Sequence, residues 1–440
     1  MTDKHPAGQP RRVFLDFVGC RLNQAEIERM AREFAARGDV IAASSTDADL
    51  IVINTCAVTH EAERKSRQMI RQAGRANPAA AIAATGCYAQ LAPDDLARLP
   101  GVAHVIGSAE KDRLVPLVSA SAPAYDLEPV QRDPLPPGTL GRTRAFVKVQ
   151  DGCDNRCTFC VTTLARGAGR SRPPEEILTE IDLLLGMGYQ EVVLTGVHLG
   201  SYGHDRGDRD GLAGLVRAVL SRTAVPRLRL SSLEPWDLSP AFFDLWEDPR
   251  LCPHLHLPLQ SGCDRTLRRM ARRTTQASFS ALVEAARARI PDLALTTDII
   301  VGFPGETDAD FAESLHYVES IGFARLHIFP YSPREGTAAA ALPDQVPDIV
   351  KDARKAQMHA LSARLWEAFQ RAQVGRTVNV LWESARGAGP GGFRWVGHTP
   401  NYLRVTTIAP QMLANTITPA RLIRLTADGL IAQPQGGQPS

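Results

Sequence analysis

The chain has 440 residues, a length that suggests about three domains. Its composition, 44% hydrophobic and 22% charged, argues against a disordered or fibrous chain and is enough to bury sizeable cores. Fifty basic and 48 acidic residues leave a net charge of +2, which does not indicate a uniformly basic nucleic-acid binder but leaves local basic faces open.

Neither a membrane span nor a secretory signal is indicated. No apolar run reaches the roughly 18 residues that a transmembrane helix needs. Met1–Pro10 lacks the apolar core of a signal peptide. We therefore expect a cytoplasmic protein with no membrane partner. Cytoplasmic thiols stay reduced, so the eight cysteines suit metal binding or catalysis better than disulfides.

The first predicted domain, residues 11–120, alternates short apolar runs with helical patterns. One helical stretch, Asn23–Ala36, carries apolar residues at helical spacing. Three βα units of this kind predict a small, Rossmann-like parallel sheet. Its predicted strands are Val13–Val18, Leu50–Ile53 and Ala80–Ala84.

Cys20, Cys56 and Cys87 each stand just beyond the carboxyl end of one of these strands. In a parallel sheet those ends lie at one edge, where ligands bind. Cysteines that are distant in sequence would then converge into a three-thiolate site. The alternative is that they are small buried hydrophobic residues, but their common placement beside glycine or threonine argues against it.

Residues 121–140 are rich in proline and predict a linker. A second series of βα units follows over residues 141–372. Six such units predict an open, partial (β/α)6 barrel with its chemistry at the carboxyl ends of the strands. The predicted strands are Ala145–Val149, Glu191–Leu194, Arg227–Leu230, His254–Leu257, Ala294–Ile300 and Ala324–Phe329. The tail, residues 373–436, has short β-rich runs and predicts a small, locally basic β-barrel.

The strongest motif is the run Cys153-x3-Cys157-x2-Cys160, directly after the first strand of the second series. Three thiolates on one short loop can hold a [4Fe–4S] cluster and leave its fourth iron open to a small molecule. A zinc site is the alternative, but no nearby cysteine or histidine completes the four ligands that structural zinc takes. We therefore expect an iron–sulfur cluster here.

This spacing, with Phe159 before the third cysteine, resembles the radical S-adenosylmethionine superfamily. Together with Cys20, Cys56 and Cys87, the pattern is similar to the methylthiotransferase family over residues 11–435. The resemblance implies a radical core, a C-terminal TRAM domain that grips RNA, and two [4Fe–4S] clusters. The N-terminal cysteines would hold the second, auxiliary cluster, which delivers sulfur, and S-adenosylmethionine would supply both the methyl group and the radical.

The resemblance also implies which segments at the strand ends line the cofactor cavity. These segments are polar or rich in glycine, and each side chain in them has the alternative of a strand-end cap. The candidate cofactor-binding residues are Phe159, Thr195, Gly196, Ser232, Glu234, Gln260 and Asp298. No acid/base pair is expected, because the cofactors carry the chemistry.

Contacts with RNA are expected from basic and aromatic side chains near the mouth of the barrel and in the tail. The candidates are Arg166, Arg170, Arg376, His398, Tyr402 and Arg404. A further basic run over Arg265–Arg273 is either a phosphate contact or a solvated helix face. For Tyr402 the alternative is a place in the core of the tail barrel.

The family divides by substrate. The segments Gly19–Gln24, Phe146–Cys153 and Gly397–Tyr402 resemble the branch that acts on threonylcarbamoyladenosine in the tRNA anticodon arm. Isopentenyladenosine in tRNA and an aspartate of a ribosomal protein are the alternatives, and a non-catalytic iron–sulfur protein for RNA binding or electron transfer is the rival class. The resemblance implies an electron donor such as flavodoxin or ferredoxin. One departure is Val161–Leu164, which lacks the proline common in the family at this place.

Overall fold

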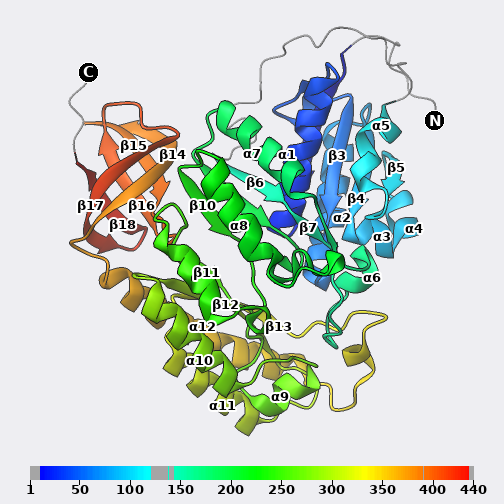
Figure 1. The fold of residues 1–440 in the computed structure, drawn as a ribbon. Helices are drawn as coiled ribbons and strands as arrows, with labels where there is room; N and C mark the ends of the chain where they lie inside the picture. The colour runs from blue at the N-terminus through cyan, green and yellow to red at the C-terminus, as the bar shows by residue number, and fades with distance from the viewer. Residues whose placement is uncertain (1–9, 120–136, 138–142, 390, 436–440) are drawn as a thin grey trace. The chain divides into compact units, whose positions relative to one another are not determined.

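The computed structural model of the chain describes residues 10–119, 137, 143–389 and 391–435 (Figure 1). Most of the predicted linker, residues 121–136 and 138–140, lies outside the described residues. Contacts within the chain divide it into two compact units. Unit 1 comprises Met1–Leu135, Asp151–Gly169 and Ser332–Ala340, and unit 2 comprises Pro136–Gln150, Arg170–Tyr331 and Ala341–Ser440.

Unit 1 is built on a parallel five-stranded sheet with the order β2-β1-β3-β4-β5. This order is that of a doubly wound sheet, which opens a ligand crevice where the strand order reverses, here between β1 and β3. The two outer strands were not predicted, because neither has a continuous buried apolar run. The strands are β1 (Arg12–Phe17), β2 (Val40–Ile41), β3 (Leu50–Thr55), β4 (Ala81–Gly86) and β5 (Val102–Ile106).

The helices of unit 1 follow from amphipathic spacing and from capping. The first helix buries Leu22, Ile27, Met30 and Phe34 on one face. The second begins at Thr59, whose hydroxyl accepts from the backbone N–H of Ala62 at 3.1 Å. The helices are α1 (Arg21–Ala36), α2 (His60–Ala76), α3 (Cys87–Leu91), α4 (Pro93–Ala97), α5 (Leu114–Val118) and α6 (Thr162–Arg166).

Unit 2 contains the predicted partial barrel. Two parallel three-stranded sheets, β10-β9-β6 and β11-β12-β13, are joined by the bridges Leu228↔Leu251 and Ser232↔His256. The six strands therefore form one open series, and the predicted α/β fold class is confirmed. The strands are β6 (Arg144–Lys148), β9 (Glu191–Thr195), β10 (Arg227–Leu230), β11 (His254–His256), β12 (Ala294–Val301) and β13 (Arg325–Pro330).

Helices cover the barrel strands and bury one contiguous apolar core with them. The helix α11 shows why the sequence starts a helix where it does: Thr307 and Asp310 form a reciprocal capping box at its first turn. Across the described part of the chain, no helix combines the length and the apolar character needed to cross a bilayer. The helices are α7 (Pro174–Gly186), α8 (Gly211–Arg222), α9 (Asp264–Arg269), α10 (Gln276–Arg289), α11 (Asp308–Ile321) and α12 (Asp348–Arg371).

The tail forms the predicted small barrel, which is closed in the order β14-β15-β16-β18-β17. Trp382, Trp395, Val405 and Leu422 fill its interior. Closure removes the exposed edges that a small sheet would otherwise present. The strands are β14 (Thr377–Gly389), β15 (Gly392–His398), β16 (Arg404–Ala409), β17 (Thr416–Thr426) and β18 (Gly429–Pro434).

The loop that carries the Cys153 motif leaves and re-enters unit 2 at two short strands. The chain crosses into unit 1 within β7 (Gln150–Asp151) and returns just before β8 (Arg170–Ser171). Both predicted cysteine sets therefore belong to unit 1. The segment Ser332–Ala340 joins the same unit, where the Ala339 N–H donates to the Thr158 carbonyl at 2.8 Å.

Candidate functional site

The three N-terminal cysteines stand at the carboxyl ends of neighbouring strands, as the sequence predicts. Cys20 follows β1, Cys56 follows β3, and Cys87 opens α3 directly after β4. Cys20 and Cys56 flank the point at which the strand order reverses. This is the edge of the sheet at which a doubly wound fold binds its ligand.

The same three thiols are close enough to influence each other electrostatically. Burial, and then the neighbouring thiolates of Cys20 and Cys87, raise the pKa of Cys56 to about 12. Cysteine ligates iron as the thiolate, so binding a cluster would favour the deprotonated form of these side chains. The donor set thus fits a cluster held by three cysteines.

Gly19 makes room for this arrangement. Its φ of +101° lies in a region that residues with a side chain rarely adopt. A Cβ atom at this position would stand 2.7 Å from the Sγ of Cys56. The glycine before Cys20 is therefore required by the close approach of its backbone to the side chain of Cys56.

The second cysteine set lies on the loop before α6. Cys153, Cys157 and Cys160 are all partly exposed. The Cys160 N–H donates to the Cys157 carbonyl at 3.1 Å, and the Thr162 N–H donates to the Cys160 Sγ at 3.4 Å. Such backbone turns and N–H···S bonds suit thiolates that ligate a cluster.

A cavity of about 350 Å³ adjoins this loop within unit 1. Cys157 and Cys160 line it from the loop, and Gly336 and Thr337 line it from the Ser332–Ala340 segment. An open iron on this loop would therefore face space in which a small molecule can bind. Phe159 is half-buried on the same loop, and its predicted cofactor contact stays a prediction.

Arg166 does not occupy the place that the sequence suggests. We expected it to contact RNA, but its side chain is 2% exposed and its guanidinium contacts Glu26, Asp151 and the Cys87 Sγ. A group so enclosed cannot reach a phosphate. The predicted RNA contact of Arg166 is therefore corrected to a contact inside unit 1.

In unit 2, the loop after β9 is held from the neighbouring strand end. The Gln150 Oε1 accepts from the His198 N–H at 2.9 Å, and a Cβ on Gly196 would stand 3.0 Å from the same oxygen. The His198 ring forms an ion pair with Asp237. Thr195 is buried, and its carbonyl accepts from the Val149 N–H at 2.9 Å. Thr195 therefore helps to fix the end of β9, from which the loop at Gly196 begins.

Three other predicted cofactor residues make contacts at the strand ends. Glu234 accepts two hydrogen bonds from Arg272, at 3.1 and 2.6 Å, and the Arg272 guanidinium lies 4.3 Å from the Trp236 ring centre. Gln260, with φ +74°, exchanges backbone hydrogen bonds with β12. Ser232 bridges to β11. Within the basic run, Arg272 is thus a buried ion-pair partner of Glu234.

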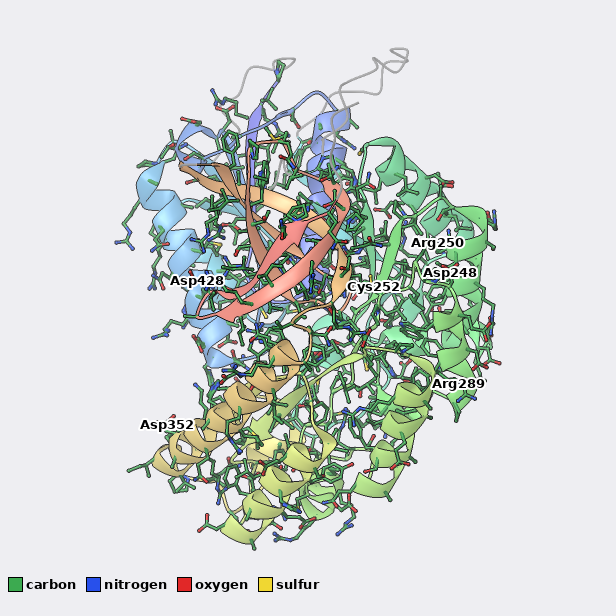
Figure 2. All side chains as sticks on the ribbon, turned by 90° about the vertical axis from the view of Figure 1, so that its left-hand side faces the viewer. Asp248, Arg250, Cys252, Arg289, Asp352 and Asp428 are labelled. Carbon is green, nitrogen blue, oxygen red and sulfur yellow. The ribbon has the colours of Figure 1, made fainter. Side chains whose placement is uncertain are left out.

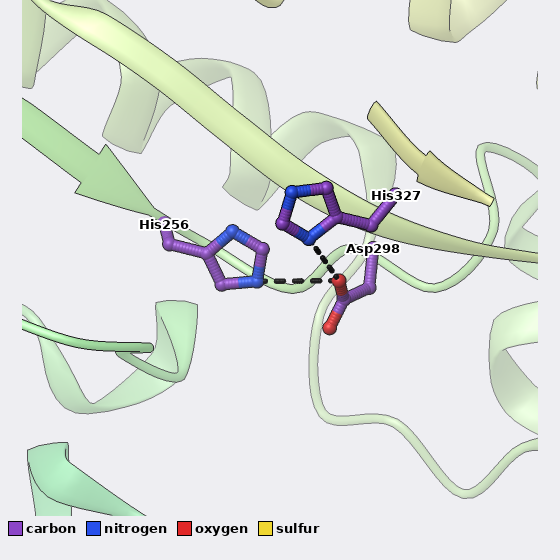
Figure 3. A group of neighbouring side chains, drawn as sticks. All are labelled: His256, Asp298 and His327. Atoms are coloured by element: carbon purple, nitrogen blue, oxygen red, sulfur yellow. Dashed lines mark ion pairs between the residues drawn. The ribbon is translucent and has the colours of Figure 1, made fainter. Parts of the chain in front are cut away.

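Asp298 lies between two histidines from the adjacent strands (Figure 3). Its Oδ1 is 3.3 Å from the His256 Nε2 and 3.4 Å from the His327 Nδ1. Burial alone would raise the pKa of Asp298, but the two imidazoles outweigh it and hold the pKa below its usual range. One ligand atom from each residue lies within 4.8 Å of the others, a spacing at which a divalent ion could also be held. Neither histidine is among the candidates from the sequence, although both lie within predicted strands, His256 as the last residue of β11 and His327 inside β13.

The aromatic residues predicted to stack on RNA bases are engaged within unit 2. The Tyr402 ring lies 4.1 Å from the Arg229 guanidinium and 5.1 Å from that of Arg144. The His398 Nδ1 lies 2.8 Å from the Glu383 carboxylate. Tyr402 thus joins the small barrel to the barrel strands, whereas His398 pairs within the small barrel. Their predicted stacking on RNA bases stays a prediction.

The predicted basic contacts of RNA differ in their surroundings. Arg376 forms an ion pair with Asp292. Arg404 is half-buried and Arg170 is exposed. The last two keep their predicted role as a proposal.

The cysteines outside the two sets are buried. Cys252 is labelled in Figure 2 and precedes β11 in the sequence. Its carbonyl accepts from the Trp246 indole N–H at 2.9 Å. The Cys263 Sγ lies 3.5 Å from the Asp310 Oδ1. Both have the surroundings of small core residues.

Two protein-family models match parts of the chain. Residues 147–318 match the radical SAM superfamily, and residues 12–107 match the uncharacterized protein family UPF0004. The structure is similar to that of the radical S-adenosylmethionine methyltransferase TsrM from Kitasatospora setae, with a TM-score of 0.54 and 15% identity over 76% of this chain and 77% of that one. Fold and cysteine loop define a radical S-adenosylmethionine protein.

Curated relatives define the family more closely. The threonylcarbamoyladenosine tRNA methylthiotransferase MtaB of Bacillus subtilis is 35% identical over 92% of both chains, and that of Thermotoga maritima is 39% identical over 84% of this chain and 86% of the relative. A tRNA-2-methylthio-N(6)-dimethylallyladenosine synthase of Novosphingobium aromaticivorans is 38% identical over 91% of this chain and 92% of the relative. The chain belongs to the radical S-adenosylmethionine tRNA methylthiotransferase family. Membership implies a [4Fe–4S] cluster, S-adenosylmethionine and a tRNA substrate.

Proposed function

We propose that this chain replaces the C2 hydrogen of N6-threonylcarbamoyladenosine at position 37 of tRNA by a methylthio group, giving 2-methylthio-N6-threonylcarbamoyladenosine. The observation that supports this substrate is the similarity, at 35–39% identity over most of the chain, to relatives named for threonylcarbamoyladenosine. The segments Gly19–Gln24 and Gly397–Tyr402 favour the same branch.

A second substrate has support of its own. Relatives named as 2-methylthio-N(6)-dimethylallyladenosine synthases are 38–40% identical over 84–91% of this chain. The two groups of relatives are similar to this chain at nearly the same level of identity. The modified nucleoside therefore has to be identified by experiment.

The residues of this chain would serve the reaction in two groups. Cys153, Cys157 and Cys160 would hold the radical cluster beside the 350 Å³ cavity. Bound together, the cluster and S-adenosylmethionine supply the one-electron chemistry that activates a C–H bond. The three strand-end cysteines of unit 1 would hold the auxiliary cluster, which would carry or deliver the sulfur. An electron donor such as flavodoxin or ferredoxin would reduce the enzyme.

Unit 2 would bind the rest of the cofactor and the RNA. Asp298, held anionic between its two histidines, would accept hydrogen bonds from hydroxyl or amine groups of S-adenosylmethionine. The loop at Gly196 has room for the close approach of a ligand to backbone carbonyls. Arg170 and Arg404 would contact phosphates of the anticodon arm.

The test of the substrate is mass spectrometry of tRNA nucleosides from cells with and without this gene. We expect loss of 2-methylthio-N6-threonylcarbamoyladenosine and accumulation of its precursor. If only the 2-methylthio derivative of isopentenyladenosine is lost, the enzyme is still a tRNA methylthiotransferase, but its substrate is isopentenyladenosine. If both nucleosides persist, the protein's tRNA substrate is neither, and methylthiolation of a ribosomal-protein aspartate is tested next.

The test of the two clusters is iron content. The anaerobically reconstituted chain should hold about eight irons, because each cluster contains four. Cys56→Ala and Cys157→Ala should each lose about half, and Cys157→Ala should also abolish release of 5′-deoxyadenosine. If the Cys56→Ala variant still holds about eight irons, the N-terminal cysteines do not hold a cluster.

A further inference from the structure

The guanidinium of Arg166 stands at the centre of a buried polar network in unit 1. Its Nε donates to the Sγ of Cys87 at 3.3 Å, and one terminal nitrogen donates to Glu26 at 3.0 Å and to Asp151 at 2.9 Å. The other terminal nitrogen donates to the Asn23 Oδ1 at 2.8 Å. Four partners from three parts of the sequence therefore fix the orientation of one side chain.

The same network reaches the other strand ends that carry the N-terminal cysteines. The Asn23 amide donates to the carbonyl of Val18 at 2.7 Å and to that of Thr55 at 3.2 Å. These carbonyls lie at the ends of the strands that lead to Cys20 and Cys56. Arg166 thus orients Asn23, which in turn links the two segments.

The charges of the network define what Arg166 contributes. Glu26 and Lys111 are completely buried and form an ion pair at 2.7 Å. Glu26 and Asp151 also pair with Arg166, so that two cations face two carboxylates. Lys111 pairs with Glu26, whereas Arg166 is in hydrogen-bond contact with a cysteine sulfur.

Arg166 also belongs to the other cysteine loop. It is the last residue of α6, which begins two residues after Cys160. Asp151, one of its partners, lies two residues before Cys153. One side chain therefore connects the loop of the proposed radical cluster with a ligand of the proposed auxiliary cluster.

We propose that Arg166 is a positioning residue that raises the reduction potential of the auxiliary cluster by donating its Nε–H to the Cys87 thiolate. Adding an electron makes a cluster more negative, and a charge-assisted hydrogen bond to a ligand sulfur stabilises that state. This inference rests on the proposed auxiliary cluster at Cys20, Cys56 and Cys87.

The experiment uses the full-length chain with Cys153, Cys157 and Cys160 all changed to alanine, so that only the auxiliary cluster is reconstituted. Its midpoint potential is measured by redox titration followed by electron paramagnetic resonance. Iron content is measured on the same samples. About four irons per chain are expected, and a chain without iron would refute the proposed cluster itself.

In this background, Arg166→Gln should lower the midpoint potential of the auxiliary cluster. At a fixed potential, the ratio of reduced to oxidised cluster should fall at least tenfold, which corresponds to about 59 mV for a one-electron couple. Arg166→Lys keeps the positive charge but loses the Nε–H, so its shift should have the same sign and be smaller. If Arg166→Gln does not retain iron, Arg166→Lys provides the measurement.

The matched control is Lys111→Gln. It removes a cation from the same buried network but leaves the contact with Cys87 in place. Its potential should stay close to that of the parent chain. An unchanged potential in the Arg166 variants with full iron, or an equal shift in Lys111→Gln, would overturn the role of the Arg166–Cys87 contact.

Discussion

Replacing Glu191 by glutamine should destabilise unit 2 strongly. The Glu191 carboxylate is completely buried and pairs with Arg227 at 2.9 Å and with Arg229 at 2.8 Å. These arginines also donate to the carbonyls of His398 and Pro400 in the small barrel, at 3.2 and 2.9 Å. Removing one partner of a buried ion pair costs about 3–5 kcal/mol, since the remaining charge is left uncompensated. With two arginines affected, we expect a loss near the upper end of that range, about 5 kcal/mol.

The assay is equilibrium unfolding in urea, followed by tryptophan fluorescence. Trp382 and Trp395 lie buried in the small barrel and report on it directly. With a slope of about 3 kcal/mol per molar urea, the midpoint should fall by more than about 1 M. The matched control is Glu175→Gln, which breaks an exposed ion pair with Arg222 and should leave the midpoint unchanged. A loss below about 1 kcal/mol for the Glu191 variant would refute the reasoning.

The stability difference between the parent chain and the Glu191→Gln variant should depend on pH in a definite direction. Burial would raise the pKa of Glu191, but Arg229 and Arg227 outweigh it and hold the pKa well below its usual range. Stability that depends on a lowered carboxyl pKa is present above the unfolded value of about 4.3 and is lost as the pH falls toward the folded value. The stability difference between the parent chain and the variant should therefore be constant near pH 7 and shrink below about pH 4.3.

Three further predictions concern the sites. Gly19→Ala should lower the iron content of the reconstituted enzyme by up to half, because its Cβ would stand 2.7 Å from the Cys56 Sγ; full iron would contradict the required close approach. Asp298→Asn should weaken S-adenosylmethionine binding at least tenfold in equilibrium dialysis of the reconstituted chain, and unchanged binding would remove this residue from the cofactor site. Arg404→Ala should reduce the slope of log affinity for tRNA against log salt by about 0.7–0.9, as expected for one lost phosphate contact, whereas an unchanged slope would exclude that contact.

The sequence by itself was enough to predict the α/β fold class and to group six cysteines into two sets. The motif Cys153–Cys160 is recognised from its spacing, because three cysteines on one short loop stay near one another along the chain. Cys20, Cys56 and Cys87 could be grouped because apolar runs predict strands, and the carboxyl ends of parallel strands share one edge. The two short outer strands β2 and β5 escaped prediction because edge strands lack a continuous apolar run.

Only the tertiary structure decided what the charged and aromatic side chains do. From the sequence, Arg166 is predicted to contact RNA. In the structure it is buried, because its charge is compensated by Asp151 and by Glu26, which lies 140 residues earlier. Tyr402 reads as a base-stacking residue, yet Arg229, far away in the chain, covers its ring. A long polar side chain is placed by counter-charges from distant segments, and local spacing carries no record of them. Apolar periodicity and cysteine spacing are local, and for that reason they could be read before the fold was known.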